Sequence, residues 1–481
     1  MLTTIVFLPA AGAILVALLA RSDRVARYIA LIASVAVLVL TLLLWASFDV
    51  NNPAVQWAEH YTWIPAFNVE YFLGVDGLNM PLLALTGLLG AGAVLASWGV
   101  TLRVKEYFFW LLLLETGVLG VFASLDLLLF FLFWEVELVP MYMLISTWGS
   151  GRKTYSAMKF LIFTIAGSAL MLVGILAVYF STHTFNMMEL RDHPYTSGLI
   201  AAPGVFFLLL AAFAVKLPIW PFHTWLPDAH TDAPTAVSVM LAGVLLKMGG
   251  YGIIRLCLSM FPDVAQDYSG LLAALAVINV LYGAVLVLWQ KDLKRLIAYS
   301  SVSHMGFVLL GIASMNQVGL TGAALQMFTH GTITGLLFMV VGLVYDKAHT
   351  RHIPDLGGLA NRMPFVTVVF FIAGLAALGL PTTSGFVAEL LVFLGAFPVL
   401  RVATILAMFG VVLTAGYILW MVQRVFMGPE KPRFAAIGDS TAMERVPLIA
   451  MVAAIMIVGI YPALVTESFK AGLTPIVALF E

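Results

Sequence analysis

The most constraining feature of this chain is a succession of long apolar runs with very few charges inside them. A helix needs about 20 apolar residues to cross the hydrocarbon core of a bilayer. Hydrophobic residues make up 62% of the 481 residues and charged residues 10%, whereas soluble domains have roughly 45–50% and 25%. The sequence therefore predicts an all-α polytopic membrane protein and excludes a soluble globular one.

About fourteen membrane-spanning helices are expected when the apolar runs are divided at charge clusters, Pro and Gly. The spans lie near 2–20, 28–48, 78–100, 107–124, 126–148, 157–181, 202–231, 235–258, 269–290, 295–314, 318–345, 363–398, 401–427 and 446–468. The longest polar stretches, near 49–77 and 428–445, are expected to form ordered surface loops.

The distribution of Lys and Arg predicts the orientation of the chain. Most of the 24 Lys and Arg fall in loops that follow odd-numbered spans, and cytoplasmic loops collect these residues. Both termini should therefore lie outside. The loop that carries Asp49, Glu59, Glu70 and Asp76 contains no Lys or Arg, which agrees with an outer position.

Charge and cysteine content limit the partners and cofactors. The net charge is −1 and the basic residues are scattered, so we expect contact with membrane lipids and no nucleic-acid partner. Cys257 is the single cysteine, and one thiolate cannot hold an iron–sulfur cluster. No cofactor is therefore expected in this chain, and any redox group must lie elsewhere.

Two spans, the seventh and the twelfth, are too long for one straight crossing and carry Pro in their middle, at Pro218 and Pro381. Proline removes a backbone donor and clashes with the preceding turn, so each span should be a broken helix. The breaks lie five spans apart and cross in opposite directions, which predicts two inverted five-helix repeats, the pattern of secondary transporters. We expect 1–106 to form three helices and an outer loop, 107–258 and 259–427 the repeats, and 428–481 a loop and the last helix.

Six titratable groups are predicted near the middle of the membrane, one on each of six spans. An ionisable side chain at that depth costs at least a few kcal/mol, so each is a candidate functional residue. They are Glu135 in the fifth span, Lys216 in the seventh, Lys247 in the eighth, His304 in the tenth, His330 in the eleventh and Glu389 in the twelfth.

Such a set of buried groups suits proton movement. A buried Lys switches between its charged and neutral forms as a carboxylate approaches or leaves, because the opposite charge favours the protonated form. Glu135 beside Lys216 would be such a switch, and the other four groups could carry the proton onward. A single Glu–Lys pair could equally be structural glue between helices, but six central groups in line favour transport.

Other polar residues carry less weight. Glu137 is two positions from Glu135 and should face a different side of the helix, as a supporting or lipid-side group. A cluster at the end of the seventh span matches no standard zinc pattern, so helix capping and packing are favoured over a metal site. Its members are His223, Asp228, His230 and Asp232.

Several motifs form a specific set between about residues 70 and 430. They are 214–230 (AVKLPIWPFHTWLPDAH), 233–235 (APT), 241–247 (LAGVLLK), 292–306 (DLKRLIAYSSVSHMG) and 385–389 (GFVAE). The set resembles the antiporter-like membrane subunits of respiratory complex I. Within that family, residues 74–78 (GVDGL), residues 134–140 (WEVELVP) and the acid Glu389 resemble the M type, since the L and N types carry a lysine in the twelfth helix.

The resemblance implies proton translocation driven by electron transfer from NADH to quinone in other subunits. It implies that Glu135 and Lys216 form the coupling pair, that Lys247 is the central lysine, and that Glu389 serves the outward half-channel, with His304 and His330 as connections. FMN, iron–sulfur clusters and quinone would belong to partner subunits. The neighbouring L-type and N-type subunits would be partners, and this chain would be a non-redox part of a translocating enzyme.

Three alternatives share this fold and these Lys and Glu positions. They are a subunit of a multisubunit sodium/proton antiporter, the membrane arm of a hydrogenase, and a ferredoxin-dependent complex. Glu137 keeps the last alternative open, because NdhD-type relatives also carry an acid there. A simple channel fits poorly, because a continuous pore needs no such titratable groups. The bacterial inner membrane is the expected location, ahead of the thylakoid or mitochondrial inner membrane.

Overall fold

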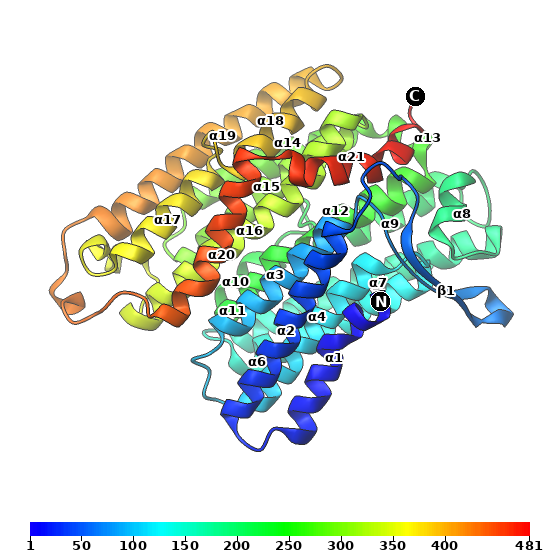
Figure 1. The fold of residues 1–481 in the computed structure, drawn as a ribbon. Coiled ribbons are helices and arrows are strands. Elements are labelled where there is room, and N and C mark those ends of the chain that lie inside the picture. Colours follow the sequence, from blue (N-terminus) through cyan, green and yellow to red (C-terminus); the bar gives the residue numbers. More distant parts are fainter.

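The computed structural model describes all residues, 1–481, and is almost entirely helical (Figure 1). Eleven helical segments are long and apolar enough to cross a membrane. They are α1 (Leu2–Leu19), α2 (Asp23–Ala46), α4 (Val104–Ala123), α5 with α6 (Leu127–Val136 and Leu138–Trp148), α7 (Lys153–Thr182), the segment Thr235–Leu258 that contains α11 (Thr235–Met240) and α12 (Leu246–Gly252), α14 (Ser269–Leu288), α15 (Leu293–Ala313), α16 (Gln317–Ala348), α19 (Arg401–Val422) and α20 (Ala442–Ile460).

Four shorter apolar helices complete the set of long elements. They are α3 (Met80–Ala96), α9 (Ala202–Lys216), α17 (Pro364–Ala377) and α18 (Ser384–Ala396). Short or peripheral helices are α8 (Met187–Asp192), α10 (Trp225–Asp232), α13 (Pro262–Asp267) and α21 (Ala463–Val477). The prediction of a polytopic helical protein is confirmed. The structure has eleven helical segments long enough to span a membrane, and the predicted total of fourteen spans also counts the shorter helices α3, α9 and α17 with their continuations.

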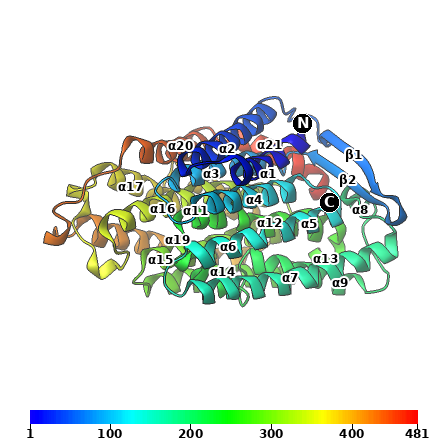
Figure 2. The ribbon, with the colours of Figure 1, turned by 90° about the horizontal axis from the view of Figure 1, so that it is seen from below.

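The helices form a buried central group surrounded by an outer shell. Within their most apolar windows, 100% of the residues of Thr235–Leu258 and 94% of those of α15 and of α16 are buried, against 28–39% in α1, α2, α19 and α20. Figures 1 and 2 show α16 surrounded by other helices, with α1 and α2 at one edge of the molecule. The outer helices expose many large apolar side chains, so their exposed faces suit lipid or another apolar surface.

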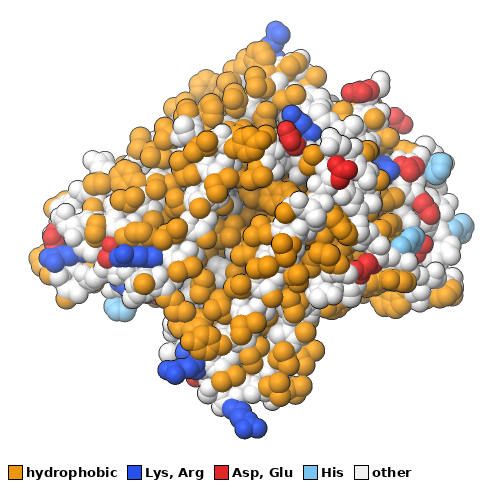
Figure 3. All heavy atoms as spheres, in the orientation of Figure 1, with side chains coloured by type: hydrophobic (Ala, Val, Ile, Leu, Met, Phe, Trp, Pro, Cys, Tyr) orange, Lys and Arg blue, Asp and Glu red, His pale blue; other side chains and the backbone are white.

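Charged side chains avoid most of the visible surface, which is apolar in Figure 3. Asp, Glu and His gather at the edge where Figure 1 shows the hairpin and α8, whereas Lys and Arg gather mainly at the left and lower edges. This separation is typical of a membrane protein with two unlike ends.

Both predicted helix breaks are confirmed. The seventh span is divided into α9, which ends at Lys216, and α10, which begins at Trp225. The twelfth is divided into α17, which ends at Ala377, and α18, which begins at Ser384. Pro218 has no N–H to donate to the carbonyl of Ala214, and the N–H of Ile219 takes that partner at 2.9 Å.

Two polar or terminal stretches differ from expectation. The loop near 49–77 contains an antiparallel hairpin of β1 (Gln56–Ile64) and β2 (Val69–Val75). The last span was expected near 446–468, but α20 ends at Ile460 and a separate helix, α21, begins after Pro462. The reason is Pro462, because a residue before proline is pushed away from helical angles.

One local arrangement occurs twice, 166 residues apart. Asp126 forms a backbone bridge with Asn186, and Asp292 forms the same bridge with His352. Each Asp also caps the helix that follows it, α5 or α15, by accepting two backbone N–H bonds. The long helices α7 and α16 both end at a histidine with positive φ, His183 and His349, again 166 residues apart. These three pairs of positions thus share one offset along the chain.

Candidate functional site: a buried row of titratable groups

Lys216 lies where the seventh span breaks, and it forms a buried ion pair. Its ammonium nitrogen Nζ is bonded to the carboxylate Oε1 of Glu137. Lys216 is 1% exposed and Glu137 is 0% exposed. The rings of Trp134 and Phe160 each lie 5.4 Å from Nζ, so aromatic faces add to the stabilisation of the cation.

The predicted pairing of Glu135 with Lys216 is wrong, because Glu137 takes that position. The two acids do lie on different sides of the helix, as expected, but the sides are reversed. Glu137 faces the interior together with Trp134, whereas Glu135 is half-buried and neighbours Val136, which is 38% exposed. Oε1 of Glu135 has no hydrogen-bond partner in this chain.

Lys247 forms the second part of the site and contacts His330. It is 0% exposed, and its Nζ lies 2.8 Å from Nδ1 of His330 and is bonded to the carbonyl of Ala242. Two π-helical turns, Leu241–Leu245 and Ile253–Leu258, flank the helix α12 that carries this lysine. Such turns are frequent at functional sites because they redirect side chains and free carbonyl groups.

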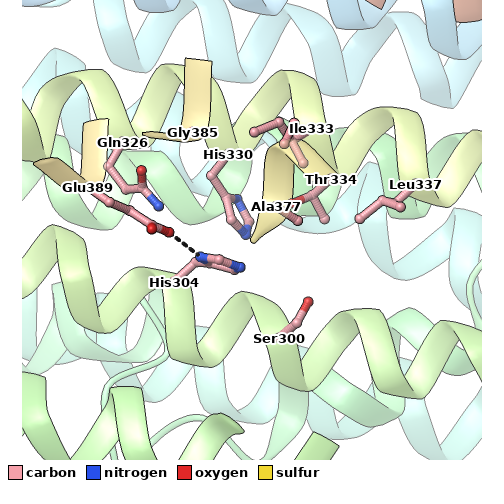
Figure 4. A pocket seen from close by; sticks show the side chains of 11 residues that line it. Ser300, His304, Gln326, His330, Ile333, Thr334, Leu337, Ala377, Gly385 and Glu389 are labelled. Atoms are coloured by element: carbon pink, nitrogen blue, oxygen red, sulfur yellow. Dashed lines mark ion pairs between the residues drawn. The ribbon is translucent and has the colours of Figure 1, made fainter. Parts of the chain in front are cut away.

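His304 and Glu389 continue the row from His330. The ring centroids of His330 and His304 are 5.6 Å apart, and Nδ1 of His304 lies 3.5 Å from Oε1 of Glu389. Figure 4 shows these three side chains converging from α15, α16 and α18 on one small cavity, which Ser300 and Gln326 also line. The cavity has a volume of about 10 Å³, which is room for about one water molecule.

A glycine in the second break lets the chain approach Glu389. Gly379 has φ +77°, a conformation that other residues rarely adopt, and a Cβ there would lie 2.8 Å from Oε2 of Glu389. Glu389 itself is 6% exposed. The broken twelfth span thus places unwound backbone beside the carboxylate at the end of the row.

The two lysine-bearing segments are in direct contact. A Cβ at Gly249 would lie 2.6 Å from the backbone nitrogen of Leu217 and 2.7 Å from the carbonyl oxygen of Phe213. Gly249 is two residues from Lys247, and Leu217 follows Lys216. No direct hydrogen bond joins the lysines, so the site has two parts. The first is the ion pair of Glu137 with Lys216. The second is the succession of Lys247, His330, His304 and Glu389, in which the two histidine rings lie near each other without a hydrogen bond.

The His–Asp cluster of the seventh span makes ion pairs and packing contacts. Asp228 accepts from Lys159 at 2.7 Å and lies 3.5 Å from a guanidinium nitrogen of Arg295. The buried ring of His230 stacks on Phe338 with centroids 4.6 Å apart. These contacts agree with the packing role that the spacing favoured.

Glu115 and Asp76 are among the buried acids that were not found from the sequence. Glu115 on α4 is 2% exposed, and its Oε2 accepts from Ser34 at 2.8 Å, with no cation beside it. Asp76 forms a buried ion pair with Arg255, with an N–O distance of 2.6 Å. Glu115 could have been found as a charged residue inside an apolar span. Asp76 could have been found through Arg255, because a buried cation needs an acid beside it.

The fold and this row define the class of the protein: a polytopic helical membrane protein with an internal path of buried titratable groups. The family model described as NADH:quinone oxidoreductase/Mrp antiporter, TM, matches residues 124–414. That range contains all the titratable groups described above as the buried row: Glu137, Lys216, Lys247, His304, His330 and Glu389. The chain therefore belongs to this family of antiporter-like membrane proteins.

Two individual relatives are similar to this chain over nearly its whole length. The chain is 43% identical to NADH-quinone oxidoreductase subunit M of Rhodobacter capsulatus, over 97% of this chain and 94% of that protein. It is 42% identical to NAD(P)H-quinone oxidoreductase chain 4 of Gloeobacter violaceus, over 97% and 91%.

Solved structures agree on the fold. A chain of respiratory complex I from Thermus thermophilus with bound NADH has a TM-score of 0.92 at 29% identity, and the match covers 100% of both chains. A chain of the Mrp complex from Dietzia has a TM-score of 0.87 at 23% identity, over 100% of this chain and 98% of that chain, which shows the fold alone.

Proposed function

We propose that this chain is the M-type membrane subunit of a bacterial NADH-quinone oxidoreductase and that it translocates protons. The observation that carries the proposal is the close succession of four buried titratable groups, from Lys247 past His330 and His304 to Glu389. Buried titratable groups in a membrane are costly and mark proton or ion pathways. The similarity to subunit M of Rhodobacter capsulatus over nearly the whole chain supports the choice of complex.

The pair of Glu137 and Lys216 acts as the switch in this proposal. When the carboxylate is close, it favours the charged ammonium, and when it moves away, the lysine can pass its proton to the adjoining segment. Lys247 lies on that adjoining segment, two residues from the contact that Gly249 makes with the end of α9. His330 and His304 then exchange the proton onward, since histidine does so near neutral pH, and Glu389 delivers it to the outward half-channel.

Glu135 remains a proposed member of the path, with a different partner. Its half-buried carboxylate lies beside exposed apolar residues such as Leu132 and Val139, with no cation of this chain against it. A carboxylate at that depth needs a cation or a hydrogen-bond donor. We propose that a neighbouring antiporter-like subunit of the L or N type supplies that group.

The proposed assembly places the redox chemistry in other chains. FMN, iron–sulfur clusters and quinone would be bound by partner subunits, and this chain would be a non-redox part of the translocating enzyme. We propose fourteen spans with both termini outside the bacterial inner membrane. The local arrangements that recur 166 residues apart support two repeats, 107–258 and 259–427, between the terminal parts 1–106 and 428–481.

A ferredoxin-dependent complex is the second candidate. The identity to NAD(P)H-quinone oxidoreductase chain 4 of Gloeobacter violaceus, 42%, is nearly as high as the 43% identity to the Rhodobacter protein. The sodium/proton antiporter is a third possibility that shares the fold. These differ in the partners and the electron donor, not in the row of residues.

The proposal is tested by isolating the native particle from gently solubilised membranes. Its subunits are identified by mass spectrometry, and quinone reduction is measured with NADH and with ferredoxin. Flavin and iron–sulfur subunits together with NADH-dependent activity are the expected result. Activity with ferredoxin alone would favour the second candidate, and a particle of membrane subunits without redox activity would show that the chain belongs to an antiporter.

A further inference from the structure

Asn279 makes an unusual set of contacts with the broken seventh span. It lies in the middle of α14, whose sequence is otherwise apolar apart from Ser269 and Tyr282. Its side chain is 0% exposed. A buried amide is costly unless all its polar atoms are paired, so the position of this residue calls for a physical reason.

The amide of Asn279 satisfies two backbone groups that the break sets free. Its Oδ1 accepts from the N–H of Trp220 at 2.7 Å, and its Nδ2 donates to the carbonyl of Pro218 at 3.1 Å. Inside a membrane no bulk water can take these places, so unwound backbone persists only where protein groups pair with it. One side chain supplies both the donor and the acceptor.

The segment that Asn279 holds begins one residue after Lys216. On its other side, the same segment contacts Gly249, where the backbone of Leu217 leaves no space for a Cβ. The indole N–H of Trp225 also donates to the carbonyl of Val215 at 2.9 Å, which fixes the start of α10 to the end of α9. The end of α9 is therefore held from several directions, and Asn279 provides the polar contact from α14.

We infer that Asn279 is a positioning residue for Lys216. It fixes the break that ends α9 and thereby sets the distance between Lys216 and the carboxylate of Glu137. Because α14 belongs to the second half of the chain, this contact also ties the switch of the first half to the second. The inference rests on the proposed function for its consequence, proton transfer at Lys216, but the contact can be tested separately.

The test uses the assembled native complex with Asn279→Leu, which keeps the branched shape of the side chain and removes both hydrogen bonds. The matched control is Asn79→Leu. Asn79 is also 0% exposed, and its amide donates to the carbonyls of Gly74 and Phe122, but it lies away from the break. If Asn279→Leu does not assemble, Asn279→Ser is used, because its shorter side chain cannot reach both groups at once.

Two readouts are taken per assembled particle. The first is the number of protons taken up per electron as a function of pH, and we expect Asn279→Leu to lower it by about tenfold and to shift its pH profile. The second is deuterium exchange of the peptide that contains residues 217–224, which should speed up. Asn79→Leu should reduce the amount of complex and leave both readouts unchanged.

The inference is overturned if Asn279→Leu, or the Ser variant in its place, keeps the wild-type pH profile, proton uptake and exchange rate. It is equally overturned if Asn79→Leu changes both readouts to the same extent, because the effect would then be a general loss of packing. A wild-type particle without redox-driven uptake would contradict the proposed function, and the exchange measurement would still decide whether Asn279 holds the break.

Discussion

A charged side chain inside the membrane is tolerated when a side chain of opposite charge is bonded to it. Lys216 and Glu137 form such a pair. Both are buried, and neither has another opposite charge bonded to it. Removing one partner of a buried ion pair leaves an uncompensated charge and costs about 3–5 kcal/mol, whereas removing both is often neutral.

This asymmetry separates the structural role of the pair from its transport role. Glu137→Gln should reduce the amount of assembled complex, because Lys216 is left charged without a partner. The double variant Glu137→Gln with Lys216→Met should restore assembly, as judged by native gels, while proton uptake stays at least about tenfold lower than in the wild type. Normal proton uptake in the double variant would show that the pair only stabilises the packing of the helices.

The sequence alone was enough to identify the residues that stand out as titratable groups within apolar spans. Lys247, His304, His330 and Glu389 are such groups, and the structure brings them together. The choice between Glu135 and Glu137 depended on which side of α5 meets α9, and that is a property of packing between segments about 80 residues apart. A pattern read along one helix separates its sides but does not state which side faces inward.

At the scale of elements, proline and polar capping decide where helices start and stop. Pro218 and Pro381 made both breaks predictable. The hairpin β1–β2 was missed because strand pairing depends on contacts beyond the local sequence, and the separate helix α21 was missed because Pro462 was not used as a helix boundary. One cap comes from a distant loop: Asp439 accepts from the N–H of Phe365 at 2.7 Å at the start of α17.

Asp439 should make the start of α17 sensitive to acid. Burial raises the pKa of this carboxyl, but hydrogen bonds from the backbone N–H groups of Phe365 and Ser440 outweigh burial and hold the pKa below its ordinary value. Its contribution, about 1 kcal/mol for such a cap, is therefore present at neutral pH and lost as the pH falls through the lowered pKa.

The variant Asp439→Asn tests this dependence. At pH 7 it should speed up proteolysis of the loop 428–441, because the loop is held less firmly to α17. The difference from the wild type should shrink as the pH approaches the lowered pKa, since the wild-type carboxyl then also becomes neutral. An equal difference at every pH would contradict the capping role.

A second prediction at this scale concerns the contact between α12 and the end of α9. Gly249→Ala places a Cβ against backbone atoms of Leu217 and Phe213, which cannot move away as a flexible side chain could. We expect a loss of assembled complex of roughly tenfold, measured on native gels. Gly416→Ala in α19 is the control, because a Cβ there meets nothing within 4 Å; equal losses in both variants would refute the packing argument.

At the scale of the whole molecule, the row of titratable groups runs through the three most buried spans, Thr235–Leu258, α15 and α16, and ends at the second broken span. Recurrence of local structure at an offset of 166 residues suits a chain built from two similar halves. The sequence predicted two repeats from the positions of the breaks, but the offset became visible only through backbone bridges between residues far apart in the chain.

The central claim is that protons move through Lys247 and the histidines to Glu389. The most direct test measures redox-driven proton uptake per electron in inverted membrane vesicles that contain the assembled complex with Lys247→Ala. The account predicts at least about tenfold lower uptake per electron than in the wild type, at equal amounts of complex. Wild-type uptake per electron in that variant would contradict the account.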